Sequence, residues 1–252
     1  AWFPKHGPTK IKTKILILMH QREAKRTVGT GYLCPGVFAN CEVVECRWVH
    51  PEGTQSSLDE TATLLRMYPS LQKALGERRN GTVILYPGND AIDLDKMIAA
   101  VSSPRSPPEH HQSIDTLLVL DGTWHETKEL LRRIPQLCSL PKAALPMKLA
   151  AKADGRLMIR RCKRNANVGR FVCTLGATIA ALEVLEPELA VEHRREWLGP
   201  LHKLVEIQIK MLPYRLQAQK GTQVVAEYMA AGVPIVGPLA EIPTLEKMRH
   251  SE

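Results

Sequence analysis

The sequence predicts an α/β fold, in which a mostly parallel sheet carries helices on both of its faces. Short apolar, β-prone runs alternate along the chain with segments whose apolar residues recur at helical spacing, and this alternation is typical of βαβ units. The first of these runs alternates little with polar residues, as expected for a parallel strand buried on both sides. A chain of 252 residues with 44% hydrophobic side chains can also bury a large core.

Short β-prone runs are predicted to be strands. They occupy residues 14–20, 42–49, 82–86, 116–120 and 157–161. The third run is closed by Pro87-Gly88, a pair that marks a turn. The polar stretch after the first run ends in Gly29-Thr30-Gly31 and is predicted to be a loop.

Longer segments with helical periodicity lie between these runs. Helices are predicted from residue 57 to about residue 75, and at residues 93–101, 124–133, 173–185 and 197–212. Pro69 predicts a break or kink in the first helix, and Pro135 ends the third. Residues 102–113, which include His110 and His111, are predicted to be a surface loop. We expect residues 1–220 to form one domain and residues 221–252 a C-terminal tail.

Composition narrows the class of protein. No apolar run approaches the roughly 20 residues that span a bilayer, so we expect no membrane partner. The six cysteines form no C-x-x-C pair, and we interpret them as reduced thiols in a cytoplasmic or nuclear protein that holds no metal in this chain. No long exposed apolar helix is evident, which favours a monomer.

The positive charge is concentrated in one segment. Residues 142–170 contain nine Lys/Arg and one Asp, an excess of +8 that equals the net charge of the whole chain. A basic segment of this kind suits a polyanionic partner such as a nucleic acid. The alternative is an ordinary solvated surface.

The most informative segment is Asp-Gly-Thr-Trp at residues 121–124, where the fourth strand leads directly into a helix. In α/β folds the carboxyl ends of strands are where ligands bind, and a helix N-terminus offers free N–H groups. The alternative interpretation is that Asp121 or Thr123 caps the helix while Trp124 packs in the core. The usual dinucleotide, nucleoside-triphosphate, metalloprotease and serine-hydrolase motifs are absent from this sequence.

The 121–124 segment and its surroundings resemble the DTW-domain family, which is named for this block. The helix that follows it carries Lys128 and a basic pair at 132–133, and it ends in a Pro-Leu-Pro tail over residues 135–141, as in the family. Residues 20–33 resemble the family's early polar loop, Tyr86-Pro87 its short turn, and residues 160–182 its closing segment. The likeness covers roughly residues 12–212.

The resemblance implies a tRNA-uridine aminocarboxypropyltransferase. Such an enzyme moves the 3-amino-3-carboxypropyl group of S-adenosylmethionine to ring nitrogen 3 of a tRNA uridine and releases methylthioadenosine. The rRNA aminocarboxypropyltransferases, which are similar, imply a SPOUT-like fold with a C-terminal trefoil knot. The expected substrates are therefore S-adenosylmethionine and tRNA.

The same resemblance implies the site residues. Asp121 is the candidate catalytic residue, either as the base that takes the uridine proton or as a ligand for the hydroxyls or ammonium group of S-adenosylmethionine. Trp124 either stacks on a base or packs in the core. The expected S-adenosylmethionine site comprises Thr30, Gly31, Tyr86, Pro87, Gly122, Thr123, Trp124, Thr174 and Leu175.

Basic residues are expected to contact tRNA phosphates, which give affinity without choosing a sequence. The first group is Arg156, Arg160, Arg161, Lys163, Arg164 and Arg170, and the second is Lys128, Arg132 and Arg133.

The sequence departs from the family at three points. Gly29 stands where Asn is usual, Gly176 stands where Glu is usual, and the N-terminal cysteine pairs of many members are absent from this sequence. Two alternatives therefore stay open. A SPOUT-type RNA methyltransferase would differ in the mass of its product, and a non-catalytic RNA-binding protein would bind RNA without binding S-adenosylmethionine.

Overall fold

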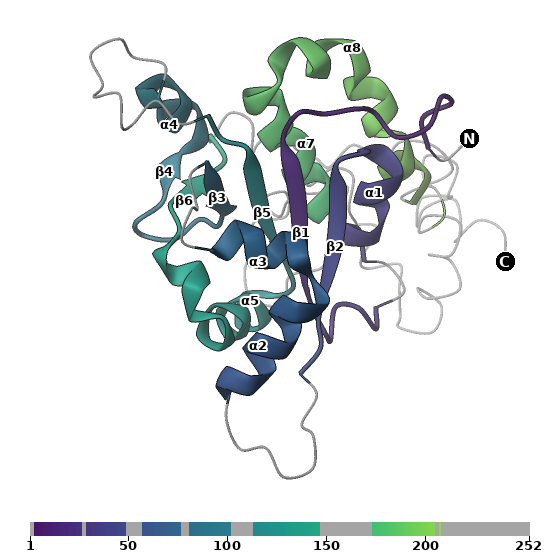
Figure 1. Ribbon diagram of the computed structural model, residues 1–252. Coiled ribbons are helices and arrows are strands. Elements are labelled where there is room, and N and C mark those ends of the chain that lie inside the picture. Colours follow the sequence, from purple (N-terminus) through teal and green to yellow (C-terminus); the bar gives the residue numbers. More distant parts are fainter. Residues whose placement is uncertain are drawn as a thin grey trace, which may run out of the picture.

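The computed structural model describes residues 3–26, 29–48, 57–76, 81–101, 113–146, 173–204 and 207. Its centre is a sheet of six parallel strands in the order β2-β1-β5-β3-β6-β4 (Figure 1). The strands are β1 (Lys14–His20), β2 (Cys41–Cys46), β3 (Thr82–Leu85), β4 (Ile92–Asp93), β5 (Thr116–Asp121) and β6 (Lys142–Ala144). The predicted parallel sheet is confirmed.

Strands β1 and β5 form the middle of the sheet. They pair in parallel from Lys14 opposite Thr116 to Met19 opposite Asp121, and six of the seven residues of β1 are buried. Successive side chains of a strand point to opposite faces. Ile15 and Ile17 therefore pack in one core cluster, whereas Leu16 and Leu18 pack in another.

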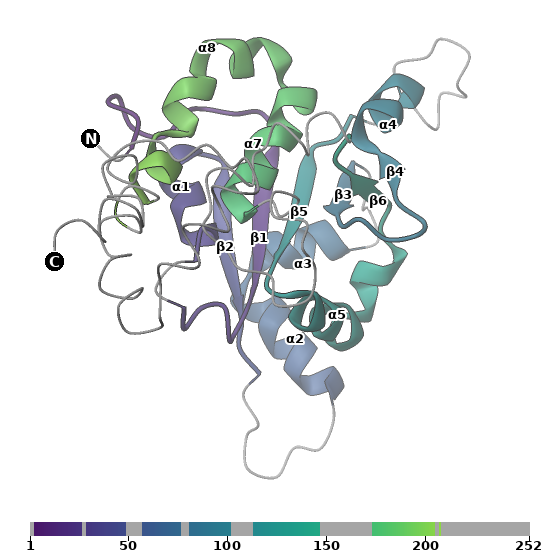
Figure 2. The ribbon, with the colours of Figure 1, turned by 180° about the vertical axis from the view of Figure 1, so that it is seen from behind.

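Helices cover both faces of the sheet, as predicted. The first face carries α1 (Cys34–Val37), α4 (Leu94–Val101), α7 (Thr174–Leu185) and α8 (Pro187–Trp197). The second face carries α2 (Ser57–Met67), α3 (Pro69–Leu75), α5 (Trp124–Arg133) and the 3-10 helix η3 (Pro135–Ser139). Helix α3 lies in front of the sheet in Figure 1, and α7 lies in front of it in Figure 2.

The chain leaves β1 and β5 in opposite directions. The connection from β1 runs to β2 through the 3-10 helix η1 (Gly31–Leu33) and α1 on the first face. The connection from β5 runs to β6 through α5 and η3 on the second face, and β2 and β6 lie on opposite sides of the β1–β5 pair. Such a reversal of direction is a topological switch point, and ligands of open α/β sheets bind outside the carboxyl ends of the strands there.

Several predicted elements are confirmed closely. Strand 14–20 and helix 124–133 have the expected bounds, and the predicted break at Pro69 separates α2 from α3. The second strand ends at Cys46, earlier than predicted, and the short strands β4 and β6 were not predicted because two or three residues carry too little pattern. The strand predicted at 157–161, residues 102–112 of the loop, and the tail after residue 207 lie outside the described residues.

The helix predicted to begin at Trp197 is wrong at its start. Trp197 is the last residue of α8, and helical residues resume at 199–204. Within α8 only Ala190 and Trp197 are buried, so the segment has too few apolar residues for a recognisable helical pattern. Trp197 ends α8 in the core, where its ring meets Phe38 edge-on at 5.3 Å and its Nε1–H donates to Thr9.

Candidate active site at the carboxyl ends of β1 and β5

Asp121 is the last residue of β5 and lies at the switch point. Its side chain is 4% exposed. Its Oδ1 accepts a hydrogen bond of 2.5 Å from the hydroxyl of Thr174, the first residue of α7. This contact joins two predicted site residues that are 53 positions apart, and it ties the end of β5 to the start of α7.

Gly31 packs directly against the Asp121 carboxylate. A Cβ at position 31 would overlap Oδ2 of Asp121 and would lie 2.9 Å from the Cε of Met19. Gly31 and the preceding Thr30 are both buried at the start of η1. Only glycine leaves room for the carboxylate at this place, so Thr30, Gly31, Asp121 and Thr174 form one contiguous group.

Gly122 and Thr123 build the N-terminus of α5. The Thr123 hydroxyl accepts from the N–H of Glu126 at 3.4 Å, and Glu126 Oε2 accepts from the N–H of Thr123 at 2.7 Å. This reciprocal pair is a capping box. A Cβ on Gly122 would lie 3.0 Å from the Cβ of Glu126. The capping interpretation of Thr123 is therefore confirmed.

Trp124 does not pack in the core. Its side chain is 55% exposed, and its ring meets Tyr86 edge-on with the centroids 6.0 Å apart. Tyr86 follows β3, so this contact brings the predicted Tyr86-Pro87 turn beside the 121–124 segment. The predicted site residue Leu175, unlike Trp124, is fully buried in the core of the first face, so it shapes the site only through packing.

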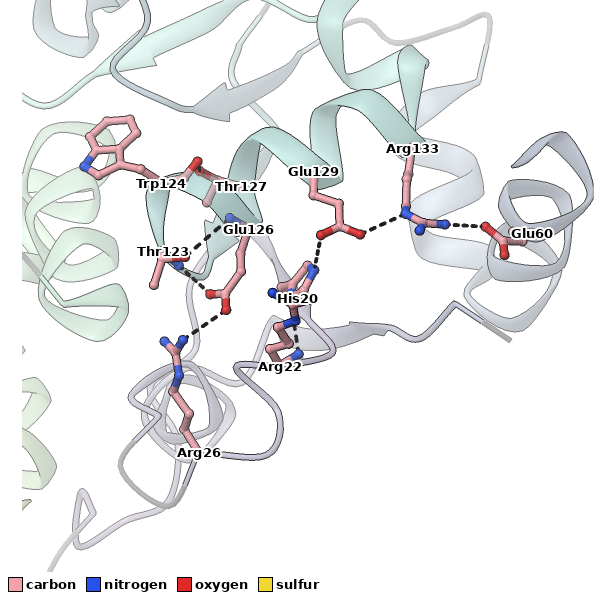
Figure 3. Close-up of polar contacts among 10 residues, drawn as sticks. All are labelled: His20, Arg22, Arg26, Glu60, Thr123, Trp124, Glu126, Thr127, Glu129 and Arg133. Carbon is pink, nitrogen blue, oxygen red and sulfur yellow. Dashed lines mark hydrogen bonds and ion pairs between the residues drawn. The ribbon is translucent and has the colours of Figure 1, made fainter. Parts of the chain in front are cut away.

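The loop after β1 is held against α5 by a guanidinium (Figure 3). Arg26 pairs with Glu23, and its Nη2 lies 3.0 Å from Oε1 of Glu126. Glu23 and Glu126 are both almost fully buried. Burial by itself would raise the pKa of Glu126, but the hydrogen bonds from Thr123 and the nearby Arg26 hold it below its ordinary value.

A second polar chain begins at His20, the last residue of β1. Its Nδ1 accepts from the N–H of Arg22 at 3.1 Å, so Nε2 carries the proton of the neutral ring and donates to Glu129 at 3.3 Å. Arg133 then joins Glu129 at 3.0 Å and Glu60 at 2.7 Å. Figure 3 shows this chain running along α5 to α2.

The predicted tRNA contacts on α5 differ in their surroundings. Lys128 and Arg132 are exposed, and together with Trp124 they recur every four residues along one face of the helix. Arg133 is instead occupied by its two carboxylates and by the ring of Trp48, whose centroid lies 4.9 Å from the guanidinium carbon. The other predicted contacts, Arg156, Arg160, Arg161, Lys163, Arg164 and Arg170, lie outside the described residues.

Sequence reasoning missed three residues of the site: Arg26, Glu126 and Tyr32. Glu126 follows Thr123 by three positions, which is the sequence pattern of a capping box and was available as a signal. The Tyr32 hydroxyl donates to Glu45 at the end of β2 at 2.5 Å. Burial, aided by the hydrogen bond to Glu45, raises the pKa of Tyr32 to about 12. No local pattern marks Arg26 or Tyr32.

The described residues contain neither a metal-binding cluster nor a membrane-spanning helix. Over those ranges, no three His, Cys, Asp or Glu side chains are grouped so that they could hold a metal ion. Over the same ranges, no helix has the length and apolar character needed to cross a membrane.

Comparison with known proteins identifies the family. The model of the DTW domain matches residues 1–209. Three curated proteins named "tRNA-uridine aminocarboxypropyltransferase 2" are similar to this chain. The Mus musculus protein is 27% identical over 205 residues, which are 81% of this chain and 57% of that protein. The Drosophila melanogaster protein is 27% identical over 213 residues, 83% of this chain and 70% of that protein.

The third relative covers less of both sequences. The Macaca fascicularis protein is 29% identical over 133 residues, which are 53% of this chain and 38% of that protein. The chain thus spans little more than half of the mouse relative's length. No solved structure matches the chain.

Proposed function

The chain belongs to the DTW-domain family, and from this premise we propose that it transfers the 3-amino-3-carboxypropyl group of S-adenosylmethionine to nitrogen 3 of a tRNA uridine. One observation carries the proposal. The Asp121 carboxylate lies at the β1–β5 switch point, where it contacts Thr174 and packs on Gly31. Three segments that resemble the family's motifs thereby meet at the place where an α/β sheet binds its ligand.

The residues at this place suit S-adenosylmethionine. The molecule carries an ammonium group and ribose hydroxyls, for which a buried carboxylate such as Asp121 is a fitting partner. Gly31 leaves the room that this carboxylate occupies, so the backbone of the early loop lies directly against it. The exposed ring of Trp124, which contacts Tyr86 edge-on, offers a surface on which the planar adenine can stack.

The reaction is a nucleophilic substitution at carbon. S-adenosylmethionine supplies the reacting methylene carbon and a sulfonium leaving group. Uridine nitrogen 3 gives up its proton and forms the new N–C bond while the C–S bond breaks. The electron pair of that bond passes to sulfur, and methylthioadenosine leaves. The protein's task is to select one of the three carbons on sulfur by position, and to accept the uridine proton.

Asp121 has two candidate roles in this scheme. As a base, its carboxylate takes the uridine proton, and Asp121→Asn then abolishes turnover while the affinity for S-adenosylmethionine is retained. As a ligand, the carboxylate holds the ammonium or hydroxyls of S-adenosylmethionine, and the same variant then loses that affinity. A variant that keeps both affinity and turnover would remove Asp121 from the site.

We propose that tRNA lies along the exposed face of α5. Lys128 and Arg132 contact phosphates there, and Trp124 stacks either on the adenine of S-adenosylmethionine or on a base of the tRNA. The basic residues between 156 and 170 stay predicted phosphate contacts. A SPOUT-like fold with a C-terminal knot is the arrangement we expect for the whole domain, and the parallel sheet with helices on both faces supports it.

The test is mass spectrometry of nucleosides from unmodified tRNA incubated with the protein and S-adenosylmethionine. The expected product is an aminocarboxypropyl adduct on uridine, with methylthioadenosine released in equal amount. A methyl adduct would instead assign a methyltransferase. Binding of tRNA without binding of S-adenosylmethionine would assign a non-catalytic RNA-binding protein.

A further inference from the structure

We propose that Arg26 is a positioning residue, which fastens the loop carrying Gly31 to the first turn of α5 and so keeps the S-adenosylmethionine side of the site formed before the ligand binds. This inference rests on the proposed function. It adds a residue that belongs to neither the expected catalytic set nor the expected binding set, and it assigns that residue to the binding step and not to the chemical step.

The contact joins distant parts of the chain through buried groups. Arg26 bridges Glu23, three positions before it, and Glu126, which is 100 positions after it. The side chains of Glu23 and Glu126 are 1% and 4% exposed, whereas that of Arg26 is 37% exposed. One guanidinium thus donates to two buried carboxylates. Arginine suits this arrangement because its planar group presents several N–H donors in a fixed fork.

The contacts of Arg26 connect to the site both through α5 and through the loop. On the α5 side, the second oxygen of Glu126 accepts from the N–H of Thr123, two residues after Asp121. On the loop side, the chain folds back at Gly29, where an added Cβ would lie 3.7 Å from the carbonyl oxygen of Arg26 and 3.8 Å from that of Glu23. Gly31 then packs on the Asp121 carboxylate. Arg26 therefore fixes the part of the loop that precedes Gly31, and Gly31 in turn contacts the Asp121 carboxylate.

The loop is also attached to α5 at its first residue. His20 donates to Glu129, which lies one helical turn after Glu126 on α5. Two acidic residues of one helix thus hold the loop at positions 20 and 26. His20 lies on β1 and is fixed by its pairing with β2, so Arg26 is the attachment whose loss frees the loop.

A loop that is docked only part of the time lowers the apparent affinity for its ligand. The apparent dissociation constant rises by the inverse of the fraction of molecules in the competent form. Once the ligand is bound the loop is docked in every molecule, so turnover at saturation is nearly unchanged. Loss of a charge-assisted hydrogen bond costs about 1.5–3 kcal/mol, which corresponds to about a 10–150-fold fall in the ratio of docked to undocked loop.

The test measures methylthioadenosine release with saturating tRNA and varied S-adenosylmethionine for three variants. Arg26→Ala is expected to raise the KM for S-adenosylmethionine about tenfold or more while kcat stays within about threefold. Arg26→Lys is expected to recover part of the loss, because an ammonium keeps the charge but not the fork. Arg22→Ala removes an exposed arginine of the same loop and is the control, with KM unchanged.

Two further measurements separate positioning from general loss of structure. Hydrogen exchange of Arg26→Ala is expected to speed up over residues 21–33 while the amides of β1 and β5 keep their protection. A double-mutant cycle of Arg26→Ala with Glu126→Gln is expected to be non-additive in KM. An active wild-type protein in which Arg26→Ala has an unchanged KM, or loses only kcat, overturns this inference. A wild-type protein that releases no methylthioadenosine overturns the proposed function instead.

Discussion

Substituting Gly31 by alanine tests whether the position of the Asp121 carboxylate governs the reaction. The new Cβ would overlap Oδ2 of Asp121 and would lie 3.2 Å from its Cγ and 2.9 Å from the Cε of Met19. Both side chains are buried, so neither can swing into solvent without disturbing the core. The carboxylate must rotate away, and its hydrogen bond from Thr174 is then lost.

The magnitude follows from these contacts. Overpacking a well-filled core costs about 1–3 kcal/mol. At about 3 °C per kcal/mol for a domain of this size, the expected fall in Tm is about 3–9 °C. The displacement of the carboxylate is close to 1 Å or more, and a misplacement of about 1 Å costs about 100-fold in rate. We therefore expect Gly31→Ala to remain folded at 25 °C and to lose about 100-fold in methylthioadenosine release.

Gly29→Ala is the matched control. Position 29 lies two residues earlier in the same loop, and a Cβ there meets nothing nearer than 3.7 Å. Its φ is not positive, since among the described glycines only Gly7 and Gly81 have a positive φ. Alanine is then expected to stabilise the fold by about 0.4–1 kcal/mol, because it lowers the conformational entropy of the unfolded chain. It is expected to leave activity intact. Equal activity of the two variants, measured at a temperature where both are folded, would refute the reasoning.

Three further outcomes follow from the same contacts. Thr123→Ala removes the hydroxyl of the capping box and is expected to lower the free energy of unfolding by about 1 kcal/mol, as measured by urea denaturation, with Thr123→Ser as the variant that retains it. The pKa values of Glu126 and Glu129 are held below the ordinary 4.5 in the folded protein, so the stability that these carboxylates contribute is present above pH 4.5 and is lost as the pH falls through their lowered pKa values. Urea midpoints measured from pH 7 to pH 3 should show this loss. Glu126→Gln should make the midpoint depend less steeply on pH. Lys128→Glu with Arg132→Glu is expected to weaken tRNA binding by at least about tenfold and to reduce its salt dependence, without changing the affinity for S-adenosylmethionine, and unchanged binding in a filter assay would exclude α5 as a tRNA surface.

Local pattern was enough to predict the central elements. The apolar runs at 14–20 and 116–120 identified β1 and β5 because buried parallel strands need unbroken apolar sequence. Helix α5 was predicted at both ends, since a capping threonine and a following proline act on their immediate neighbours. Elements with weak local signals were missed: β4 and β6 are very short, and α8 buries few of its residues.

The sequence by itself therefore determined the fold class, the strand that ends at Asp121, the capped helix that follows, and the resemblance carried by residues 121–124. Only the tertiary structure decided which residues meet there. Thr174 reaches Asp121 across 53 positions and Arg26 reaches Glu126 across 100, while Trp124 lies at the surface. Periodicity and capping record interactions within a few residues, whereas these contacts depend on the order of the strands and on the directions in which the chain leaves β1 and β5.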